Sequence, residues 1–503
     1  MSDLPALLVA LPIFGSVVAL LAGLLRSRTG WPVAVLVSIL QVVAAVALAV
    51  DAFEGTVTYV VGGFDAPFGI QLVVDGLSAT MVVLVAAVAL GVLGYARMAG
   101  PRSNAFYATY LLLVAGLTGM SVTGDVFNLY VFLEITGLAA YALVASGEGG
   151  DAALAALKYL IVGTVGASLF LLGIGYAYVA TGTLNMADLS GQLAAVGYTS
   201  LLVRAAFGLM VVGLFVKVAV FPLHTWQPTA YADAPDTVSG LISALVSTVA
   251  AYALIRIVFS VFTVGFLDAN PVARTLLIAA AAVSIVLGSL LAVAQEDLKR
   301  MLAYSSVSQF GLIVGAVAVA NGTALTGAAI HLVGHAIMKG GLFLAAGSIA
   351  TATGARTVTE FEGLSERLPG EGAAFGVLAL GMVGVPPAVG FVGKWYVALG
   401  AVEAESWPLA VVIFLSTLLT LAYFARLIER MYFREPVGEP PAATADAPVE
   451  TAGVAADGRG TGVPSPGMRA TVAVAAVLAV VLGALAVGYG ELLDPTITDL
   501  LNT

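Results

Sequence analysis

The chain has 503 residues, of which 60% are hydrophobic and only 10% are charged. A soluble domain normally carries about 25% charged residues because its surface must be hydrated, so this composition indicates an integral membrane protein. Its 20 basic and 30 acidic residues give a net charge of −10, which argues against nucleic acid partners, and the lack of cysteine excludes thiolate metal sites, iron–sulfur ligation and disulfides within the chain.

Fourteen apolar runs are long enough to cross a hydrocarbon core about 30 Å thick. In chain order, we expect spans at residues 4–25, 31–51, 73–96, 106–123, 125–146, 155–180, 199–221, 236–262, 272–294, 300–319, 322–349, 372–401, 407–431 and 470–489. The first run lacks the basic start and small-residue cleavage site of a secretory signal, so we expect it to be retained. The sequence therefore predicts an all-α polytopic membrane protein with about 14 transmembrane helices.

Basic residues in the short loops predict the orientation, because Lys and Arg are held on the cytoplasmic side. Loops on one side carry Arg26, Arg28, Arg97, Arg102, Lys299, Arg300, Arg356, Arg367, Arg430 and Arg434, with Arg459 and Arg469 in the last linker. Loops on the other side carry only Arg204 and Arg274 among many acidic residues. This alternation predicts a protein of the inner (plasma) membrane with both termini on the non-cytoplasmic side.

Ionisable residues inside the spans are candidates for function, because a charge at the centre of a bilayer costs from about 3 to more than 10 kcal/mol. Glu134 lies near the middle of the fifth predicted span, Lys217 lies in the seventh and Lys394 in the twelfth. The alternative for Glu134 is a helix-packing carboxyl, and for each lysine it is a snorkelling anchor near a helix end. A desolvated lysine loses its proton readily, whereas arginine does not, so we predict a proton relay that uses these lysines and Glu134.

The histidines of the eleventh predicted helix belong to the same pattern. His331, His335 and Lys339 follow at intervals of four residues, which places them along one stripe of that helix. Such a row could pass protons through water; a haem or metal site and a set of packing histidines are the alternatives. Axial haem ligation usually needs histidines on facing helices, and His224 is the only other histidine of the chain. We therefore expect no cofactor, and the sequence leaves a metal site undefined.

Two predicted helices, the seventh and the twelfth, contain interruptions. Pro222 follows Lys217, and the segment 384–390, with two prolines and two glycines, precedes Lys394. Proline and glycine leave backbone groups without helical hydrogen bonds, and such groups need a hydrated cavity lined by protein. Interruptions at matching positions of two halves mark ion sites in transporters. The alternative is a kink that serves only packing. Matching helix 7 with helix 12 predicts two inverted five-helix repeats.

This pattern divides the chain into five segments. The segment 434–468 is rich in Glu, Pro, Ala, Thr and Gly, so we expect a flexible cytoplasmic linker there. The expected segments are 1–105 with helices 1 to 3, 106–262 as the first repeat with helices 4 to 8, 272–433 as the second repeat with helices 9 to 13, the linker 434–468, and 469–503 with helix 14.

Two longer motifs carry a resemblance to a known family. Residues 221–235, which begin Phe-Pro-Leu-His-Thr-Trp-Gln-Pro, and residues 297–309, Asp-Leu-Lys-Arg-Met-Leu-Ala-Tyr-Ser-Ser-Val-Ser-Gln, resemble the antiporter-like family. That family comprises the large membrane subunits of respiratory complex I and the A and D subunits of Mrp-type cation/proton antiporters. The resemblance covers roughly residues 70–430 and implies a fourteen-helix subunit that assembles with other membrane subunits in the lipid bilayer and has a hydrophilic axis of lysines, histidines and water.

The resemblance also implies site residues and transported ions. Carried over by position, the site comprises Glu134, Lys217, His331, His335, Lys339 and Lys394. The eighth helix departs from the family pattern, because Thr248 stands where members usually have lysine or histidine. Thr248 cannot hold a proton charge. Either water bridges Lys217 to His331 through the hydroxyls of this helix, or the site is retuned towards a metal cation.

These observations lead to one main hypothesis and two alternatives. The main hypothesis is a proton- and cation-translocating subunit of a multisubunit Mrp-type Na⁺/H⁺ antiporter, with H⁺ and Na⁺ as the transported ions. The first alternative is a proton-pumping membrane subunit of a complex I-like redox complex, in which partner chains transfer the electrons. The second is a structural scaffold copy without transport. The main hypothesis makes the chain a secondary transporter subunit rather than a redox catalyst.

Overall fold

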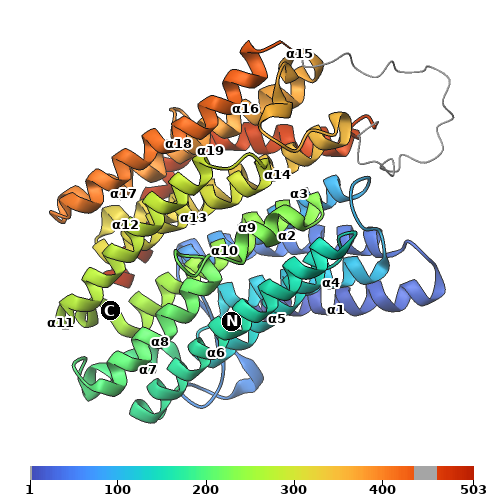
Figure 1. Cartoon of the computed structure of the whole chain (residues 1–503). Helices are drawn as coiled ribbons and strands as arrows, with labels where there is room; N and C mark the ends of the chain where they lie inside the picture. The colour runs from blue at the N-terminus through green and yellow to red at the C-terminus, as the bar shows by residue number, and fades with distance from the viewer. Residues whose placement is uncertain (1–2, 436–461, 503) are drawn as a thin grey trace.

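The computed structural model describes residues 3–435 and 462–502, so most of the predicted linker 434–468 lies outside the described residues. Figure 1 shows the long helices lying side by side, with α1 to α8 on one side of the bundle and α12 to α18 on the other. The prediction of an all-α polytopic membrane protein is confirmed.

The first half contains α1 (Leu4–Leu25), α2 (Gly30–Glu54), α3 (Gly76–Ala96), α4 (Asn104–Val122), α5 (Val126–Val144), α6 (Gly150–Thr181), α7 (Met186–Val196), α8 (Leu201–Val218), α9 (Gln227–Asp233) and α10 (Asp236–Arg256). A π-helical turn, Ile257–Phe262, joins α10 to α11 (Thr263–Ala269). The second half contains α12 (Pro271–Val293), α13 (Leu298–Val319), α14 (Gly322–Thr353), α15 (Leu364–Arg367), α16 (Pro369–Val383), α17 (Val389–Glu403), α18 (Trp407–Phe433) and α19 (Pro466–Asn502).

Thirteen helices of the described chain are long and apolar enough to cross a membrane. The remaining predicted span, 372–401, forms the two shorter helices α16 and α17, which meet at the predicted interruption. The seventh predicted span, 199–221, is likewise broken, because α8 ends at Val218 and α9 begins only at Gln227. Both predicted breaks are therefore confirmed.

Several helices begin where a side chain caps the first turn. Asp75 accepts a hydrogen bond from the backbone N of Ser78 at 2.9 Å at the start of α3, and Asp125 caps α5 in the same way. Asn321 accepts one from the N of Ala324 at 2.8 Å at the start of α14. These bonds satisfy backbone donors that the helix itself leaves free, so the polar residues between apolar runs set where the spans begin.

The centre of the bundle is formed by α10, α13 and α14. In their apolar windows 94%, 94% and 89% of residues are buried, against 22% in α1. Helices α10 and α14 approach closely at small residues, since a Cβ at Gly340 would lie 3.0 Å from the Cβ of Ala244. The C-terminal helix α19 packs on α3, α14, α16 and α17 and so connects the two halves.

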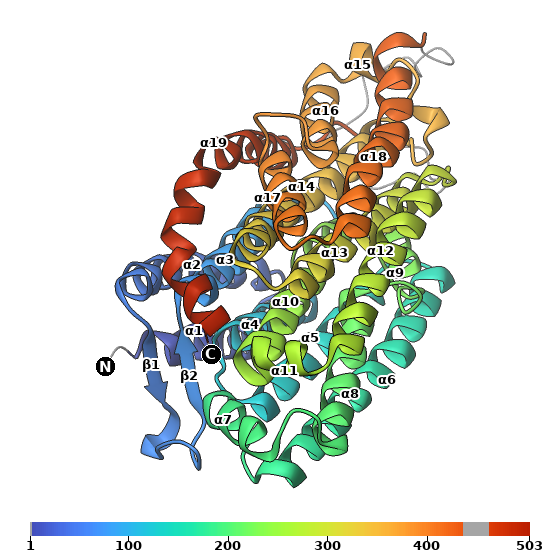
Figure 2. The ribbon, with the colours of Figure 1, turned by 90° about the vertical axis from the view of Figure 1, so that its left-hand side faces the viewer.

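The sequence did not predict two further features. The first is a short antiparallel hairpin that pairs β1 (Val57–Val60) with β2 (Gln71–Val74), with Val57 opposite Val74. One 3-10 turn, Val61–Gly63, lies in the loop of this hairpin, and another, Thr359–Phe361, lies between α14 and α15. Helix α19 also runs to Asn502, well past the predicted end of the last span at residue 489. Figure 2 shows the hairpin and both chain termini at the same end of the bundle.

Candidate functional site

Glu134 on α5 and Lys217 on α8 face each other as predicted. The Nζ of Lys217 lies 3.3 Å from Oε1 of Glu134 and donates a hydrogen bond to Oη of Tyr141 at 3.2 Å. The side chain of Lys217 is 6% exposed and that of Glu134 is 24% exposed. Gly137 leaves room for the ammonium, because a Cβ there would lie 3.2 Å from Nζ. This is a partly buried ion pair whose two members can exchange charge with each other.

The break between α8 and α9 lies directly after Lys217. Ala219 has a left-handed φ of +66° and ends α8. Side chains also bind the carbonyl groups at this end: Nε1 of Trp226 donates to O of Val216 at 2.8 Å, and Oγ of Ser247 donates to O of Lys217 at 3.3 Å. The interruption is thus lined by protein, which is the condition under which irregular backbone is tolerated at membrane depth.

A group of hydroxyls and one amide on α9 and α10 lies beside this break. Nε2 of Gln227 donates to Oη of Tyr231 and to Oγ of Ser247, both at 3.2 Å. Thr248, next to Ser247, is fully buried, and its Oγ1 has no hydrogen-bond partner among the described residues. A buried hydroxyl without a partner is costly, so such a group normally contacts ordered water or an ion. Thr248 thus lies in the middle of α10, as expected, but outside the hydrogen-bond network of Gln227, Tyr231 and Ser247.

His331 and His335 lie side by side on α14, with ring centroids 6.3 Å apart. Both are fully buried, and none of their four ring nitrogens has a hydrogen-bond partner within the described parts of the chain. A neutral imidazole carries one donor and one acceptor, and a buried polar group without a partner is costly, so these four nitrogens call for contacts with water or ions. No set of three or more acidic or histidine side chains gathers as metal ligands in residues 3–435 and 462–502.

Lys339 continues the histidine row along α14 but turns towards α13. Its Nζ donates to O of Leu302 at 3.0 Å and to Oγ of Ser305 at 2.8 Å. Oη of Tyr423 on α18 donates to the same Ser305 Oγ at 2.8 Å. Within the described residues the amino group of Lys339 is thus held by neutral oxygen atoms and by no carboxylate, in contrast to Lys217.

Lys394 on α17 reaches back to the break between α16 and α17. Its Nζ donates to O of Met382 at 2.7 Å and to O of Val383 at 3.1 Å, the last carbonyl groups of α16. The C-terminal end of a helix carries partial negative charge, which favours a cation there. Gly393 brings this helix against the histidine row, because a Cβ at Gly393 would lie 2.8 Å from the Cβ of His331.

The predicted residues lie on helices that pack one against the next. Helix α8 carries Lys217 and contacts α10, α10 contacts α14, and α14 contacts α17 with Lys394. Among the described residues no direct hydrogen bond joins Lys217 to His331, or His331 to Lys394. Transfer of a proton along this series would need water between the groups.

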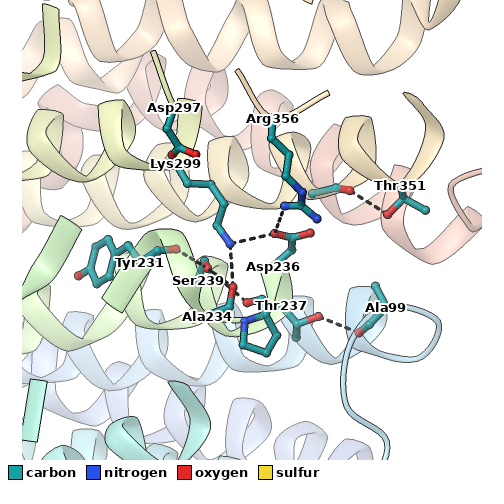
Figure 3. Close-up of polar contacts among 12 residues, drawn as sticks. Ala99, Tyr231, Ala234, Asp236, Thr237, Ser239, Asp297, Lys299, Thr351 and Arg356 are labelled. Atoms are coloured by element: carbon teal, nitrogen blue, oxygen red, sulfur yellow. Dashed lines mark hydrogen bonds and ion pairs between the residues drawn. The ribbon is translucent and has the colours of Figure 1, made fainter. Parts of the chain in front are cut away.

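A partly buried ion-pair cluster closes one end of α10. Oδ1 of Asp236 lies 2.9 Å from Nζ of Lys299 and 3.6 Å from Nη1 of Arg356, as Figure 3 shows. Nζ of Lys299 also donates to O of Ala234 at 2.8 Å. The sequence predicts Lys299 as a basic residue of a short loop, and it lies at the start of α13 with a side chain that is only 8% exposed. Its partner Asp236 is 63 residues away, so the sequence did not reveal this pairing.

The opposite end of α10 carries Arg256, which the sequence-based site did not include. Its guanidinium forms an ion pair with Asp75, the residue that caps α3. Burial raises the pKa of Asp75, but the charge of Arg256 and hydrogen bonds from Arg256 and Ser78 outweigh that effect, so the pKa lies below its ordinary value. An arginine inside the predicted span 236–262 was a sufficient signal to find this site.

Sequence comparison yields two groups of relatives. The N subunit of an NADH-quinone oxidoreductase from Desulforudis audaxviator is 46% identical over 462 residues, which cover 89% of this chain and 90% of the relative. The D subunit of a Na⁺/H⁺ antiporter from Bacillus subtilis is 33% identical over 386 residues, which cover 76% of this chain and 77% of the relative.

Structural comparison gives a similar result. A chain in the structure of the Mrp complex from Dietzia sp. DQ12-45-1b matches with a TM-score of 0.87 at 28% identity, over 100% of this chain and 98% of the other. The family model described as NADH:quinone oxidoreductase/Mrp antiporter, TM, matches residues 123–420, which include Glu134, Lys217 and Lys394. The chain belongs to the NADH:quinone oxidoreductase/Mrp antiporter transmembrane family.

Proposed function

We propose that the chain is the proton- and cation-translocating membrane subunit of a multisubunit Mrp-type Na⁺/H⁺ antiporter. The observation that carries this proposal is the placement of two buried lysines, each at a break in a transmembrane helix. Lys217 lies at the end of α8, and Lys394 on α17 binds the last carbonyl groups of α16. The similarity to the D subunit of the B. subtilis antiporter and to the Mrp complex of Dietzia supports it.

In this mechanism Glu134 controls the charge of Lys217. A carboxylate 3.3 Å away stabilises the ammonium, so a change in that pairing changes the occupancy of the proton on Lys217. Protons then pass by way of water at Thr248 to His331 and His335, and onward to Lys339 and Lys394. Movement of a cation in the opposite direction is coupled to this series, with about 2.3 kcal/mol available per charge per 100 mV.

We further propose a membrane, an orientation and partner subunits for the chain. The protein is a multi-pass integral membrane protein; we place it in the plasma membrane with both termini on the non-cytoplasmic side, in a complex with other membrane subunits. Residues 106–262 and 272–433 form the two inverted repeats, and the matching breaks α8/α9 and α16/α17 support this division.

A second candidate is a proton-pumping membrane subunit of a redox complex. The 46% identical relative, which is named as part of an NADH-quinone oxidoreductase, favours it. In that case the series from Glu134 to Lys394 would carry protons in the same way, but electron transfer in partner chains would drive them rather than a Na⁺ gradient.

Proton flux in vesicles that contain the assembled complex tests the proposal. We expect Na⁺ to drive proton movement, and we expect Lys217→Ala and Glu134→Gln to lower its rate at least about tenfold, because each removes one partner of a buried charge pair. The control is Lys158→Ala, since Lys158 on α6 is partly exposed and forms no ion pair within the described residues.

Two other outcomes of the flux measurement would favour the alternative functions. Proton movement that requires an electron donor and ignores Na⁺ would favour the redox complex. Sodium-dependent flux that is unchanged in Lys217→Ala and Glu134→Gln would contradict the proposal and favour a scaffold copy whose partners perform the transport.

A further inference from the structure

A cavity of about 540 Å³ lies beside the hairpin, with residues of both strands' surroundings, such as Thr56 and Gln71, in its lining. Figure 2 shows the hairpin near the C-terminal end of α19. Exposed residues at the end of α2 and near the end of α19, such as Glu54 and Leu492, form its rim. Buried residues, including Tyr252, Asn185 and Thr123, form its floor. The cavity therefore leads from the surface into the bundle.

The charges that line this cavity favour cations. Three carboxylates, those of Glu54, Asp75 and Asp499, and a single guanidinium, that of Arg256, are among its lining residues. A recess with an excess of negative charge and low-dielectric walls raises the local concentration of positive ions. The lining is therefore suited to a proton or a small hydrated cation and unsuited to an anion.

The floor of the cavity is closed by a compact set of hydrogen bonds. Arg256 pairs with Asp75, and its Nη2 donates to Oγ of Ser78 at 2.8 Å. Its Nε donates to Oη of Tyr252 at 2.9 Å, and Tyr252 in turn donates to O of Ser121 at 2.9 Å. Arg256 thus connects the carboxylate of Asp75 with the hydroxyl of Tyr252, and all three residues line the cavity.

That hydroxyl lies close to the proposed proton path. Tyr252 follows Thr248 by four residues on α10, which is about 6 Å along the helix. Thr248 has a buried hydroxyl without a partner among the described residues, and the adjacent Ser247 donates to the carbonyl of Lys217. One turn of one helix therefore separates the cavity floor from the surroundings of Lys217.

We propose that this cavity is the outer port of the transport path and that the Asp75–Arg256 ion pair is its gate, an inference that rests on the proposed function. A proton or hydrated cation that enters the cavity competes with Arg256 for the carboxylate of Asp75. When it succeeds, the guanidinium leaves Tyr252, whose hydroxyl turns from Ser121 towards Thr248. Return of Arg256 to Asp75 closes the path.

Flux measurements on the assembled complex test the gate. Arg256→Gln should open it, so we expect a proton leak without Na⁺ that is at least about tenfold above the unmodified complex. Asp75→Asn should lower Na⁺-dependent flux about tenfold, because it removes the carboxylate for which the cation competes. The matched controls are Arg274→Gln and Asp268→Asn, which change a more exposed ion pair at the same end of the molecule and outside the cavity.

Thiol labelling tests the port without relying on transport. The chain has no cysteine, so a single introduced cysteine is read without background in this subunit by its mass shift. A small cationic thiol reagent that cannot cross the membrane should modify Ser260→Cys, on the cavity wall, from the outer side. It should modify Thr248→Cys from that side at least about tenfold faster when Arg256→Gln is also present.

The results separate the two proposals. Equal labelling of Thr248→Cys with and without Arg256→Gln, or labelling only from the cytoplasmic side, would overturn the port even if flux in the unmodified complex is normal. Gated labelling without any Na⁺-dependent flux in the unmodified complex would keep the port and contradict the proposed function. A leak in Arg274→Gln as large as that in Arg256→Gln would also overturn the gate.

Discussion

Thr248 is the residue at which this chain departs most clearly from its family resemblance. Its hydroxyl is fully buried in the middle of α10 and has no partner among the described residues. A fixed lysine or histidine at this position would carry the proton itself, whereas a hydroxyl can only hold a water molecule in place. In the proposed path, the step between Lys217 and His331 would therefore depend on water bound at this hydroxyl.

We predict opposite effects of Thr248→Val on transport and on stability. Valine has nearly the same shape but holds no water, so Na⁺-dependent proton flux should fall about tenfold. Removing an unpaired buried hydroxyl should leave the melting temperature unchanged or raise it. Thr248→Ser keeps the hydroxyl and should retain most of the flux. Equal flux in the valine and serine variants would contradict a role for this hydroxyl.

Asp75 should make the stability of the protein depend on pH in acid. Its pKa lies below the ordinary value of 3.8 in the folded state, so its contribution is present above about pH 3.8 and is lost as the pH falls through the lower folded value. Asp75→Asn leaves Arg256 without its partner and should destabilise the folded state on the order of 3 kcal/mol at neutral pH.

Thermal unfolding of the purified complex across pH measures this effect. The difference in melting temperature between the Asp75→Asn variant and the unmodified chain should be largest near neutral pH and should shrink below about pH 3.8. A difference that grows on acidification would contradict the assignment of a stabilising ionised Asp75.

At the level of elements, the broken helices connect sequence to site most directly. Gly384 ends α16 with a φ of +98°, and Lys394 reaches the carbonyl groups that this break exposes. Only glycine adopts that backbone conformation without strain. The glycine therefore fixes the position of the carbonyl groups that hold the ammonium.

We predict that Gly384→Ala destabilises the protein by about 1 kcal/mol through this strain and lowers Na⁺-dependent flux. The added Cβ would also lie 3.4 Å from Cδ of Lys394. Gly370→Ala, at the start of the same helix, is the control, because a Cβ there meets nothing within 4 Å. Melting temperature and flux should change in the first variant and not in the second; equal behaviour would contradict the role of the break.

Helix positions and breaks were predictable because apolar run length, Pro222 and Gly384 act locally. The end of α19 was not, because the acidic residues Glu491 and Asp494 look like the end of a span, whereas the helix continues against the rest of the bundle. The hairpin β1–β2 was missed because its strands have only four residues each. The pairing of Lys299 with Asp236 was missed because the two residues are distant in sequence.

On the scale of the whole molecule, the site is an arrangement of helices from both halves of the chain. The sequence supplied the titratable residues, since Glu134, Lys217 and the row on α14 stand out in apolar runs. It did not supply the order in which α8, α10, α14 and α17 pack, nor the pairing of Arg256 with Asp75, because those contacts join residues far apart in the chain.

The orientation of the molecule leads to a direct prediction. Phe68, at the tip of the hairpin, is 95% exposed, and Arg102 is exposed in the loop before α4. In the cysteine-free chain, Phe68→Cys should react with an impermeant thiol reagent only from outside the cell, and Arg102→Cys only from the cytoplasmic side. The reverse pattern would invert the orientation and place the cavity on the cytoplasmic side.

Proton transfer along this path needs water within the bundle between Lys217 and Lys394, and a structure of the assembled complex that resolves ordered water tests for it directly. We predict water molecules bonded to Oγ1 of Thr248 and to the ring nitrogens of His331 and His335, in a series that reaches both lysines. A dry interior, with these side chains in contact only with apolar groups, would contradict proton transfer along this path.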